Sequence, residues 1–249
     1  MLMFSKNKAK FIKSLQIKKF RTEYKQFLVE GTKSIIELIN SDFVINELFV
    51  TEKFLDDFNF ILQKKKIKTT VVKENELNNI SSFSTNNSAL AICATKENEP
   101  LLIQKEEWVI VLDEIKDPGN LGTIIRIADW YGIQKIICAE TTADFYNPKV
   151  ISSSMGSFTR VRIYYCDLQN FLASANLPVF AADLEGKDVH TFHFPKGGYL
   201  LMGNESDGLS KEVRKYITEK IHIPKYGYAE SLNVAIATAI ICDNIKRSC

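Results

Sequence analysis

Apolar runs of two lengths alternate along the second half of the chain. Short continuous runs are typical of strands buried on both faces of a sheet, as in WVIVLD (108–113), IQKIICAE (133–140), RVRIYYC (160–166), PVFAAD (178–183), YLLMGNE (199–205) and KIHIPKY (220–226). Stretches with helical periodicity lie between some of them, for example NLGTIIRIADWYG (120–132), which ends at a glycine. This alternation predicts an α/β fold with a mostly parallel sheet covered by helices on both faces.

The first half of the chain has a looser pattern. Residues 27–40 have helical periodicity, and residues 45–51, 68–74 and 89–95 are candidate strands. The charged stretch ENEPLLIQKEE (97–107) contains a proline, as linkers often do. We therefore predict a small α/β domain over residues 1–98, a linker over 99–107 and a second domain over 108–249.

The composition adds one feature to this prediction, a basic segment at the N-terminus. The 249 residues are 45% hydrophobic, which suffices for two cores, and the net charge of +2 says little about partners. The first 25 residues, however, carry one acid, Glu23, against eight basic residues: Lys6, Lys8, Lys10, Lys13, Lys18, Lys19, Arg21 and Lys25. Such an arm is either a contact surface for a polyanion or the solvated face of a surface helix, and charge alone does not separate the two.

Cysteine and histidine positions bear on compartment and on metal binding. The five cysteines are widely spaced, at positions 93, 138, 166, 242 and 249, with no C-x-x-C motif. We expect reduced thiols in a cytoplasmic protein without a disulfide framework. The three histidines, His190, His193 and His222, have no ligand spacing, so we expect no metal site. Neither a signal peptide nor a membrane span is predicted.

Three polar stretches each begin where a predicted strand ends, and they are LDEIKDPGNLGTIIRIADWYG (112–132), LLMGNESDGLS (200–210) and IPKYGYAESLNVAIATAI (223–240). In open α/β sheets, ligands bind at the carboxyl ends of the strands. No G-x-G-x-x-G follows the strand near residue 112, and G-x-x-x-x-G-K-[ST] is absent. These absences argue against a Rossmann dehydrogenase and a P-loop NTPase.

The first two stretches contain candidate functional side chains. Asn120 is placed to cap a helix, and Arg126 lies on that helix among isoleucines. Because much of the helix is expected to be buried, we expect Arg126 to face a cleft. Gly203 permits close approach of a ligand to the backbone, and Glu205 follows a strand end as a possible acceptor. A capped helix with a surface arginine and an ordinary polar loop are the structural alternatives.

The third stretch joins a proline- and glycine-containing loop to a final helix with unusually small residues. Ser231 and Asn233 fall at the start of that helix. They can cap it, or they can present a hydroxyl and an amide to a ligand held by the loop.

Taken together and in this order, the three stretches resemble the three signature motifs of the SpoU (TrmH-type) RNA methyltransferases of the SPOUT superfamily. The motifs span residues 108–249. KKFRTEYKQFLVEGTKSIIELI (18–39) resembles the L30e-like substrate-binding domain of the members that act on ribosomal RNA, and NPKVISSSMGSFTRV (147–161) resembles another segment of them. The resemblance thus covers nearly the whole chain.

The resemblance implies a parallel sheet with a deep trefoil knot, an exception to the usual rule against threading, and a homodimer formed through the knotted region. It implies S-adenosylmethionine as cofactor, held by Gly203, Ile223 and Leu232, with Met202, Asn204 and Ser231 as further candidates. The small residues of the final helix would then allow it to pack in the knot and against a second subunit.

The implied reaction is methyl transfer to a ribose 2′-hydroxyl of RNA. The family's functional positions match Asn120, Arg126, Glu205, Ser231 and Asn233. A guanidinium does not give up its proton in proteins, so we expect Arg126 to hold RNA phosphate and stabilise the developing alkoxide rather than to act as a base. We expect Glu205 to orient Arg126.

Ribosomal RNA is the expected substrate and transfer RNA the alternative. Charge and position suggest RNA contacts at Lys13, Lys18, Lys19, Arg21 and Arg160. Two other classes remain open, namely an RNA-binding module of the same fold without catalysis and an unrelated α/β enzyme that uses a nucleotide cofactor.

Overall fold

The computed structural model describes residues 5–82, 86–204 and 207–248. The chain divides into two compact units. The first unit consists of Met1–Glu97 and Asp144–Thr159, and the second of Asn98–Ala143 and Arg160–Cys249. The chain therefore passes between the two units three times. The sequence pattern predicted one such passage, through the linker at residues 99–107.

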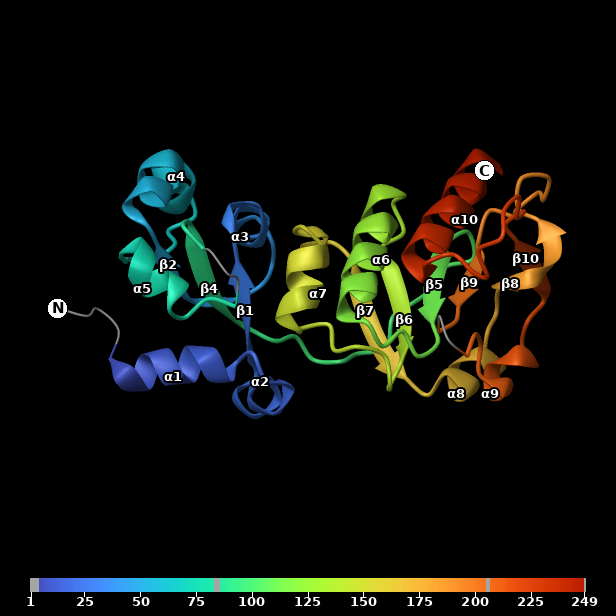
Figure 1. Cartoon of the computed structure of the whole chain (residues 1–249), viewed down its shortest axis with the longest axis horizontal. Coiled ribbons are helices and arrows are strands. Elements are labelled where there is room, and N and C mark those ends of the chain that lie inside the picture. The colour runs from blue at the N-terminus through green and yellow to red at the C-terminus, as the bar shows by residue number, and fades with distance from the viewer. Residues whose placement is uncertain (1–4, 83–85, 205–206, 249) are drawn as a thin grey trace. The chain divides into compact units, whose positions relative to one another are not determined.

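The first unit is built on a mixed sheet with strand order β1-β4-β2-β3, in which only β2 and β3 are parallel. Its strands are β1 (Gln26–Glu30), β2 (Ile45–Val50), β3 (Thr69–Val71) and β4 (Ala89–Ala94). Its helices are α1 (Lys6–Ser14), α2 (Lys18–Tyr24), α3 (Thr32–Ile39), α4 (Glu52–Lys64), α5 (Glu74–Asn78), α7 (Pro148–Ser153) and the 3-10 turn η1 (Ser157–Thr159) (Figure 1).

Residues 27–40 have the periodicity of a helix, but the helical prediction is wrong for the first part of this segment. Phe27, Leu28 and Val29 are all buried in strand β1, and the helix begins only at Thr32. Gly31 separates the two elements with φ of 86°, a left-handed conformation that suits glycine. A continuous apolar run buried on both sides is a strand feature that short-range periodicity does not distinguish from a buried helix.

Residues 144–159 attach to the first unit through aromatic side chains. The ring centroid of Phe27 in β1 lies 4.6 Å from that of Tyr146 and 6.3 Å from that of Phe158. Phe43 packs on Phe27 and Phe158 in turn, at 5.6 and 5.7 Å. Asn147 caps α7, since its side-chain oxygen accepts from the backbone N–H of Lys149 at 2.9 Å.

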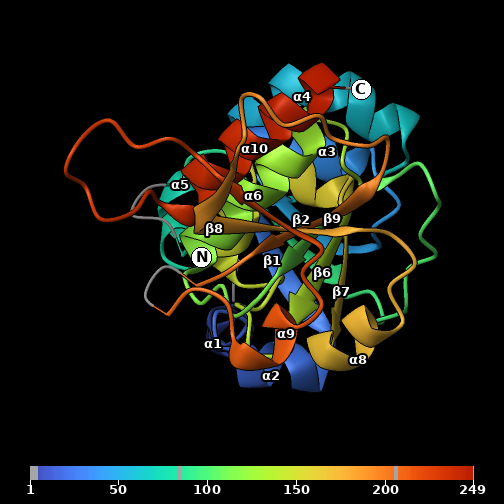
Figure 2. The same ribbon diagram turned by 90° about the vertical axis from the view of Figure 1, so that its right-hand side faces the viewer.

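The second unit is a six-stranded sheet with order β10-β8-β9-β5-β6-β7, and every neighbouring pair is parallel. Its strands are β5 (Trp108–Leu112), β6 (Lys135–Ala139), β7 (Arg162–Cys166), β8 (Val179–Asp188), β9 (Gly198–Met202) and β10 (Glu219–His222). Its helices are α6 (Pro118–Trp130), α8 (Leu168–Ala173), α9 (Lys211–Arg214) and α10 (Val234–Ser248). Helices α6 and α10 lie on one face of this sheet and α8 and α9 on the other (Figure 2). The predicted parallel α/β architecture is confirmed.

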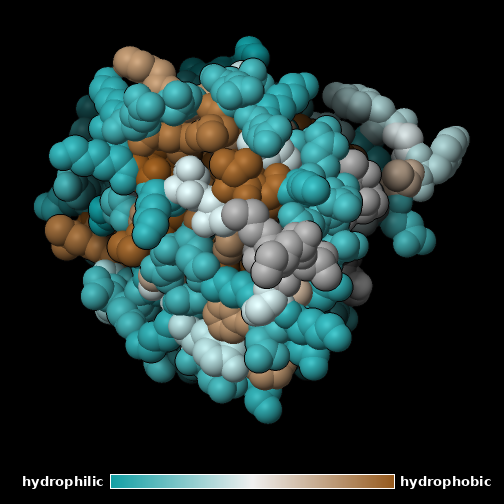
Figure 3. All heavy atoms as spheres, turned by 90° about the vertical axis from the view of Figure 1, so that its left-hand side faces the viewer, coloured by the Kyte–Doolittle hydropathy of each residue, from teal (hydrophilic) through white to brown (hydrophobic). Residues whose placement is uncertain are grey.

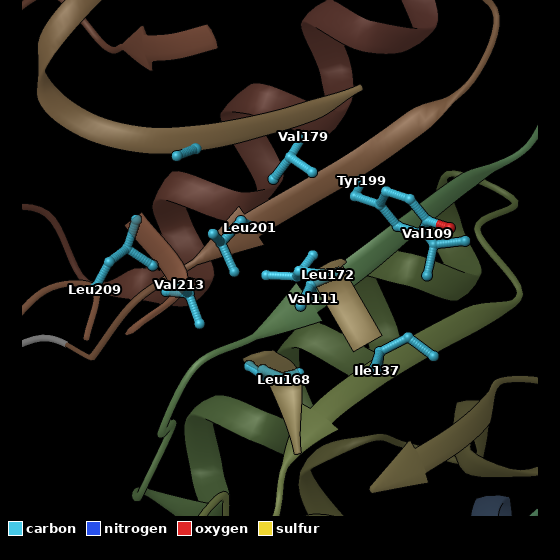
Figure 4. Close-up of a cluster of buried hydrophobic side chains, with 11 residues drawn as sticks. Val109, Val111, Ile137, Leu168, Leu172, Val179, Tyr199, Leu201, Leu209 and Val213 are labelled. Atoms are coloured by element: carbon cyan, nitrogen blue, oxygen red, sulfur yellow. The ribbon is translucent and has the colours of Figure 1, made fainter. Parts of the chain in front are cut away.

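Alternate strand residues fill the core on the α8–α9 face. Val109 and Val111 of β5 lie beside Leu201 of β9, and they pack with Leu172 of α8 and Val213 of α9 (Figure 4). The period of two along the strands sends the intervening residues to the opposite face.

Helix α6 starts earlier than expected. Its N-cap is Asp117, whose side chain accepts from the backbone N–H of Asn120 at 2.8 Å, so the prediction that Asn120 caps this helix is wrong. Pro118 occupies the first turn, where its missing N–H removes no helical hydrogen bond. The predicted end is confirmed, since Gly132 follows the cap residue Tyr131 with φ of 66°. The side chain of Asn120 is thereby available for contacts outside its own helix.

Candidate functional site

The second unit contains a cavity of about 570 Å³ beside the carboxyl ends of β9 and β10. All six residues that were candidates to hold the cofactor line it, and Ser231 is also a predicted catalytic residue: Met202, Gly203, Asn204, Ile223, Ser231 and Leu232. The walls also include Leu209, Ile221 and Ile241, which are buried apolar residues. Largely apolar walls with a few polar groups are typical of a small-molecule site.

Gly203 is required by the loop that forms one side of the cavity. A β-carbon built at this position would lie 2.5 Å from the carbonyl carbon of Gly208 and 2.8 Å from the nitrogen of Leu209. The loop closes there through two backbone hydrogen bonds between Asn204 and Gly208, of 3.0 and 2.9 Å. Close approach of protein backbone explains the glycine, whereas the sequence pattern led us to expect close approach of a ligand.

The same loop is fixed to the end of the neighbouring strand β5. The side chain of Asn204 donates to the carbonyl oxygen of Glu114 at 3.0 Å, and the buried carboxylate of Asp113 accepts from the backbone N–H of Ser210 at 2.7 Å. Glu114 has a φ of 58°, an uncommon conformation for a residue other than glycine. These bonds hold the ends of β5 and β9 in one arrangement, so the first and second signature stretches are joined directly.

The first and third stretches meet at Asn120 and Asn233. The side-chain nitrogen of Asn233 donates to the side-chain oxygen of Asn120 at 2.9 Å. The side-chain oxygen of Asn233 accepts from the backbone N–H of Ala235 at 3.0 Å, so Asn233 also caps α10. The capping predicted for this position is confirmed for Asn233.

Arg126 lies on the exposed side of α6, so the expectation that it faces a cleft is not met within this unit. Its guanidinium has no hydrogen bond or ion pair with any residue that the structure describes. Ser231 is likewise exposed, two residues before the cap of α10. Glu205, the predicted partner of Arg126, lies outside the described residues. The guanidinium of Arg126 is therefore accessible from solvent.

The predicted RNA contacts fall into two groups. Lys13, Lys18 and Lys19 are exposed on the first unit, and α1 is anchored by the buried Ile12 and Leu15 rather than free as an arm. Figure 3 shows a face of the molecule on which hydrophilic side chains surround a smaller hydrophobic area.

Two arginines of the predicted RNA surface are engaged within the protein. Arg21 is 3% exposed and donates to Asp144 from Nε at 3.1 Å and from Nη2 at 2.5 Å, and to the carbonyl of Leu15 at 2.9 Å. This buried fork ties α2 to residues 144–159 within the first unit, so Arg21 is corrected from an RNA contact to a structural residue. Arg160 is exposed but forms a bidentate ion pair with Asp129, with Nη2 to Oδ2 at 2.8 Å.

An excursion in β8 supplies a wall of the cavity that sequence reasoning missed. Ala181 pairs with Lys220 of β10, but the next pair is Lys187 with Ile221, so residues 182–186 have no partner in β10. Asp183 and Leu184 of this excursion line the cavity. The only sequence signal is Gly186, whose β-carbon would meet the carbonyl of Lys220.

The carboxyl group of Asp183 has a lowered pKa. Burial raises this pKa, but hydrogen bonds from Lys220 and from backbone N–H groups lower it by more.

Among the described residues, no group of three or more His, Cys, Asp or Glu side chains is arranged to hold a metal ion. No described helix is long and apolar enough to span a membrane. The cysteines at 93, 138, 166 and 242 are all free thiols.

Comparison with known proteins identifies the relatives of this chain. The model of the SpoU rRNA Methylase family matches residues 107–243, more than half of the chain, and that of the MRM3-like substrate binding domain matches residues 6–91. The chain is 28% identical over 243 residues to the Bacillus subtilis enzyme 23S rRNA (guanosine(2553)-2′-O)-methyltransferase RlmP, with 96% of each chain covered.

Solved structures of related methyltransferases have the same fold as this chain. An AdoMet-bound rRNA methyltransferase from Sinorhizobium meliloti has a TM-score of 0.87 at 29% identity, covering 99% of this chain and 97% of that one. A protein from Porphyromonas gingivalis described as of the TrmH family has a TM-score of 0.86 at 31% identity, covering 98% and 99%. Fold and cavity thus define an RNA methyltransferase with a separate substrate-binding domain. The chain belongs to the SpoU rRNA methylase family.

Proposed function

We propose that this protein transfers a methyl group from S-adenosylmethionine to a ribose 2′-hydroxyl of ribosomal RNA. The observation that carries the proposal is the cavity at which the second and third signature stretches meet, since all six candidate cofactor residues line it. The hydrogen bond between Asn233 and Asn120 brings the first stretch to its edge.

The residues present fit S-adenosylmethionine. The cavity volume of about 570 Å³ falls within the range of small-molecule sites. Met202, Ile221 and Leu232 offer apolar surface to an adenine ring, and the carboxylates of Asp183 and Glu230 are acceptors suited to a cationic ligand. When bound, this cofactor supplies an electrophilic methyl group on a sulfonium sulfur.

The chain's own residues must then position and stabilise the ribose oxygen. Arg126 is exposed and uncommitted among the described residues, so its fixed fork can hold an RNA phosphate and stabilise negative charge that develops on the 2′-oxygen. Asn120 and Asn233 fix the neighbouring helix ends, and Ser231 offers a hydroxyl at the same edge. Glu205 is proposed to orient Arg126.

Large-subunit ribosomal RNA is the proposed substrate class, because the named relatives RlmP and the Streptomyces viridochromogenes 23S rRNA (uridine(2479)-2′-O)-methyltransferase act on 23S rRNA. Exposed Lys13, Lys18 and Lys19 on the first unit provide cations for its phosphates. Transfer RNA is the runner-up. Free thiols at the four described cysteines suit a reducing, cytoplasmic compartment.

The proposal includes a homodimer and a trefoil knot formed by the C-terminal segment. Family membership supports both. Two further observations favour a second subunit on the α6–α10 face: Trp130 of α6 is 81% exposed, and Ile236 of α10 is 53% exposed. Sedimentation equilibrium of the wild type and of a Trp130→Glu variant tests the dimer. A monomeric wild type would refute it.

The decisive experiment incubates the enzyme with labelled S-adenosylmethionine and unmodified RNA. The RNA is fractionated into large ribosomal, small ribosomal and transfer RNA. Label in the large ribosomal fraction, mapped to a ribose and lost with Arg126→Ala, is the expected result. Label in transfer RNA alone would replace the substrate class. Cofactor binding without label in any fraction, including ribosomal precursor RNA, would favour a non-catalytic RNA-binding protein.

A further inference from the structure

We propose that Tyr226 and Tyr228 form a stacking platform for unpaired nucleobases next to the target ribose. This inference rests on the proposed function and names how the same site selects its RNA. The two tyrosines flank Gly227 in the connection between β10 and α10. That connection extends away from the neighbouring elements (Figure 2).

The exposure of the two rings is the first observation. Tyr226 is 95% and Tyr228 103% exposed, so no part of the described protein covers either ring. A β-carbon built at Gly227 would have no neighbour within 4 Å, so the space around this tip is open. Both faces of each ring are accessible, and two exposed aromatic rings within three residues offer surfaces on which planar groups can stack.

The position of the rings is the second observation. Lys225, Tyr226 and Gly227 line the candidate cofactor cavity, whereas Tyr228 does not. The loop therefore contacts the proposed methyl donor site with one part and presents Tyr228 outward. A nucleotide whose ribose is placed at the mouth of this cavity has its neighbouring bases within the same region as the two rings.

The chemistry favours RNA as the occupant. Sequence-specific recognition of RNA uses unpaired bases that stack on aromatic side chains, and each stacked base adds affinity. Lys225 is exposed beside the rings and supplies a cation for the backbone phosphate between such bases. The adjacent buried residues Leu209 and Ile221 already form the apolar wall of the cavity, so the rings are not needed to enclose the cofactor.

The test compares single and double alanine variants of Tyr226 and Tyr228 with the phenylalanine variants, which keep the rings, and the leucine variants, which keep only apolar bulk. The substrate is large ribosomal RNA transcribed in vitro. Each replacement of a tyrosine by alanine is expected to raise the KM for RNA on the order of tenfold. The phenylalanine variants should behave as wild type, and the leucine variants should behave as the alanine ones.

Controls separate this inference from the proposed function. Phe60→Ala removes an aromatic side chain that is 80% exposed on α4, and it should leave the KM unchanged. The Kd for S-adenosylmethionine, measured by calorimetry, should be unchanged in the Tyr228 variants and in Phe60→Ala, because neither residue lines the cofactor cavity. Ultraviolet crosslinking of wild-type enzyme to the transcript should recover peptides that contain Tyr226 or Tyr228.

Several results would overturn the stacking platform. A wild-type KM in the double alanine variant would show that the rings do not contact RNA. A weakened cofactor Kd with unchanged RNA KM would assign them to the cofactor, and dissociation of a dimer would assign them to a partner subunit. If the wild type methylates no RNA at all, the proposed function fails, and crosslinking alone then decides whether the rings contact RNA.

Discussion

The side-chain amide of Asn233 serves two helices at once. Its oxygen accepts from the backbone of α10, and its nitrogen donates to Asn120 of α6 at 2.9 Å. The helix pair α6 and α10 is therefore joined at its N-terminal ends by one residue from each of two signature stretches. Because both helices lie at the edge of the candidate site, this bond sets the position of the residues that follow it on each helix.

Substitution at Asn233 separates capping from bridging. Asn233→Ser keeps a side-chain oxygen for capping but is too short to bridge to Asn120, so we expect near-normal stability and a lower kcat. Asn233→Ala removes both contacts and should also lower the free energy of unfolding by about 1 kcal/mol. Denaturant melts and single-turnover methylation measure the two effects. Equal kcat in wild type and Asn233→Ser would show that the bridge does not matter for catalysis.

Arg126→Lys tests the proposed geometry at the phosphate. Lysine keeps the charge but not the planar fork, so we expect kcat to fall at least tenfold, and Arg126→Ala to reduce it by about 10²–10³. Because Arg126 is exposed and has no described partner, stability should change by less than about 0.5 kcal/mol. Near-full activity of the lysine variant would show that bidentate contact is unnecessary.

Gly203→Ala places a β-carbon against the backbone of Gly208 and should open the loop beside the cavity. We expect a loss of about 1–3 kcal/mol in stability, as for overpacking, together with a weaker Kd for S-adenosylmethionine. Gly227→Ala is the steric control, because nothing lies within 4 Å and its φ is outside the left-handed region. Calorimetry and thermal melts compare the two, and equal melting temperatures would contradict the close approach.

Arg21 and Lys18 lie on the same helix and should behave oppositely. Arg21→Ala leaves Asp144 without its buried partner and should destabilise the protein by about 3 kcal/mol. Lys18→Ala should leave stability unchanged, weaken RNA binding and lower the salt dependence of log Kd by about one. Melts and salt-titrated RNA binding provide the measurements. A stable Arg21→Ala variant with weakened RNA binding would restore Arg21 to the RNA surface.

Thiol reactivity should rise only at high pH. Burial, with the nearby carboxylates of Asp167 and Glu140, raises the pKa of Cys166 to about 11, and burial raises that of Cys242 to about 12. Because both thiols have raised pKa values in the folded protein, their contribution to the free energy of unfolding is complete below pH 9. That contribution is lost as the pH rises toward 11 to 12.

Alkylation by iodoacetamide in a Cys249→Ser variant checks this expectation. The native protein should react slowly at pH 8 and faster above pH 10, whereas the urea-unfolded protein should react readily at pH 9. Rapid native labelling of Cys166 at pH 8 would contradict the raised pKa.

The sequence by itself determined the parallel α/β unit, its buried strands and the three stretches that form the site. These features follow from local patterns, since continuous apolar runs specify buried strands and the motifs lie directly after them. It also placed the end of α6 at Gly132. Each of these features depends on short stretches of consecutive residues.

Only the tertiary structure decided which unit residues 144–159 join, whether Arg21 faces solvent and where β8 leaves its partner strand. Those outcomes depend on contacts between residues far apart in the chain, such as Arg21 with Asp144 and Phe27 with Phe158. The helical interpretation of residues 27–30 failed for the same reason, because pairing with β4 selects a strand. Periodicity reports which residues are buried, whereas the partner that buries them is a property of the whole fold.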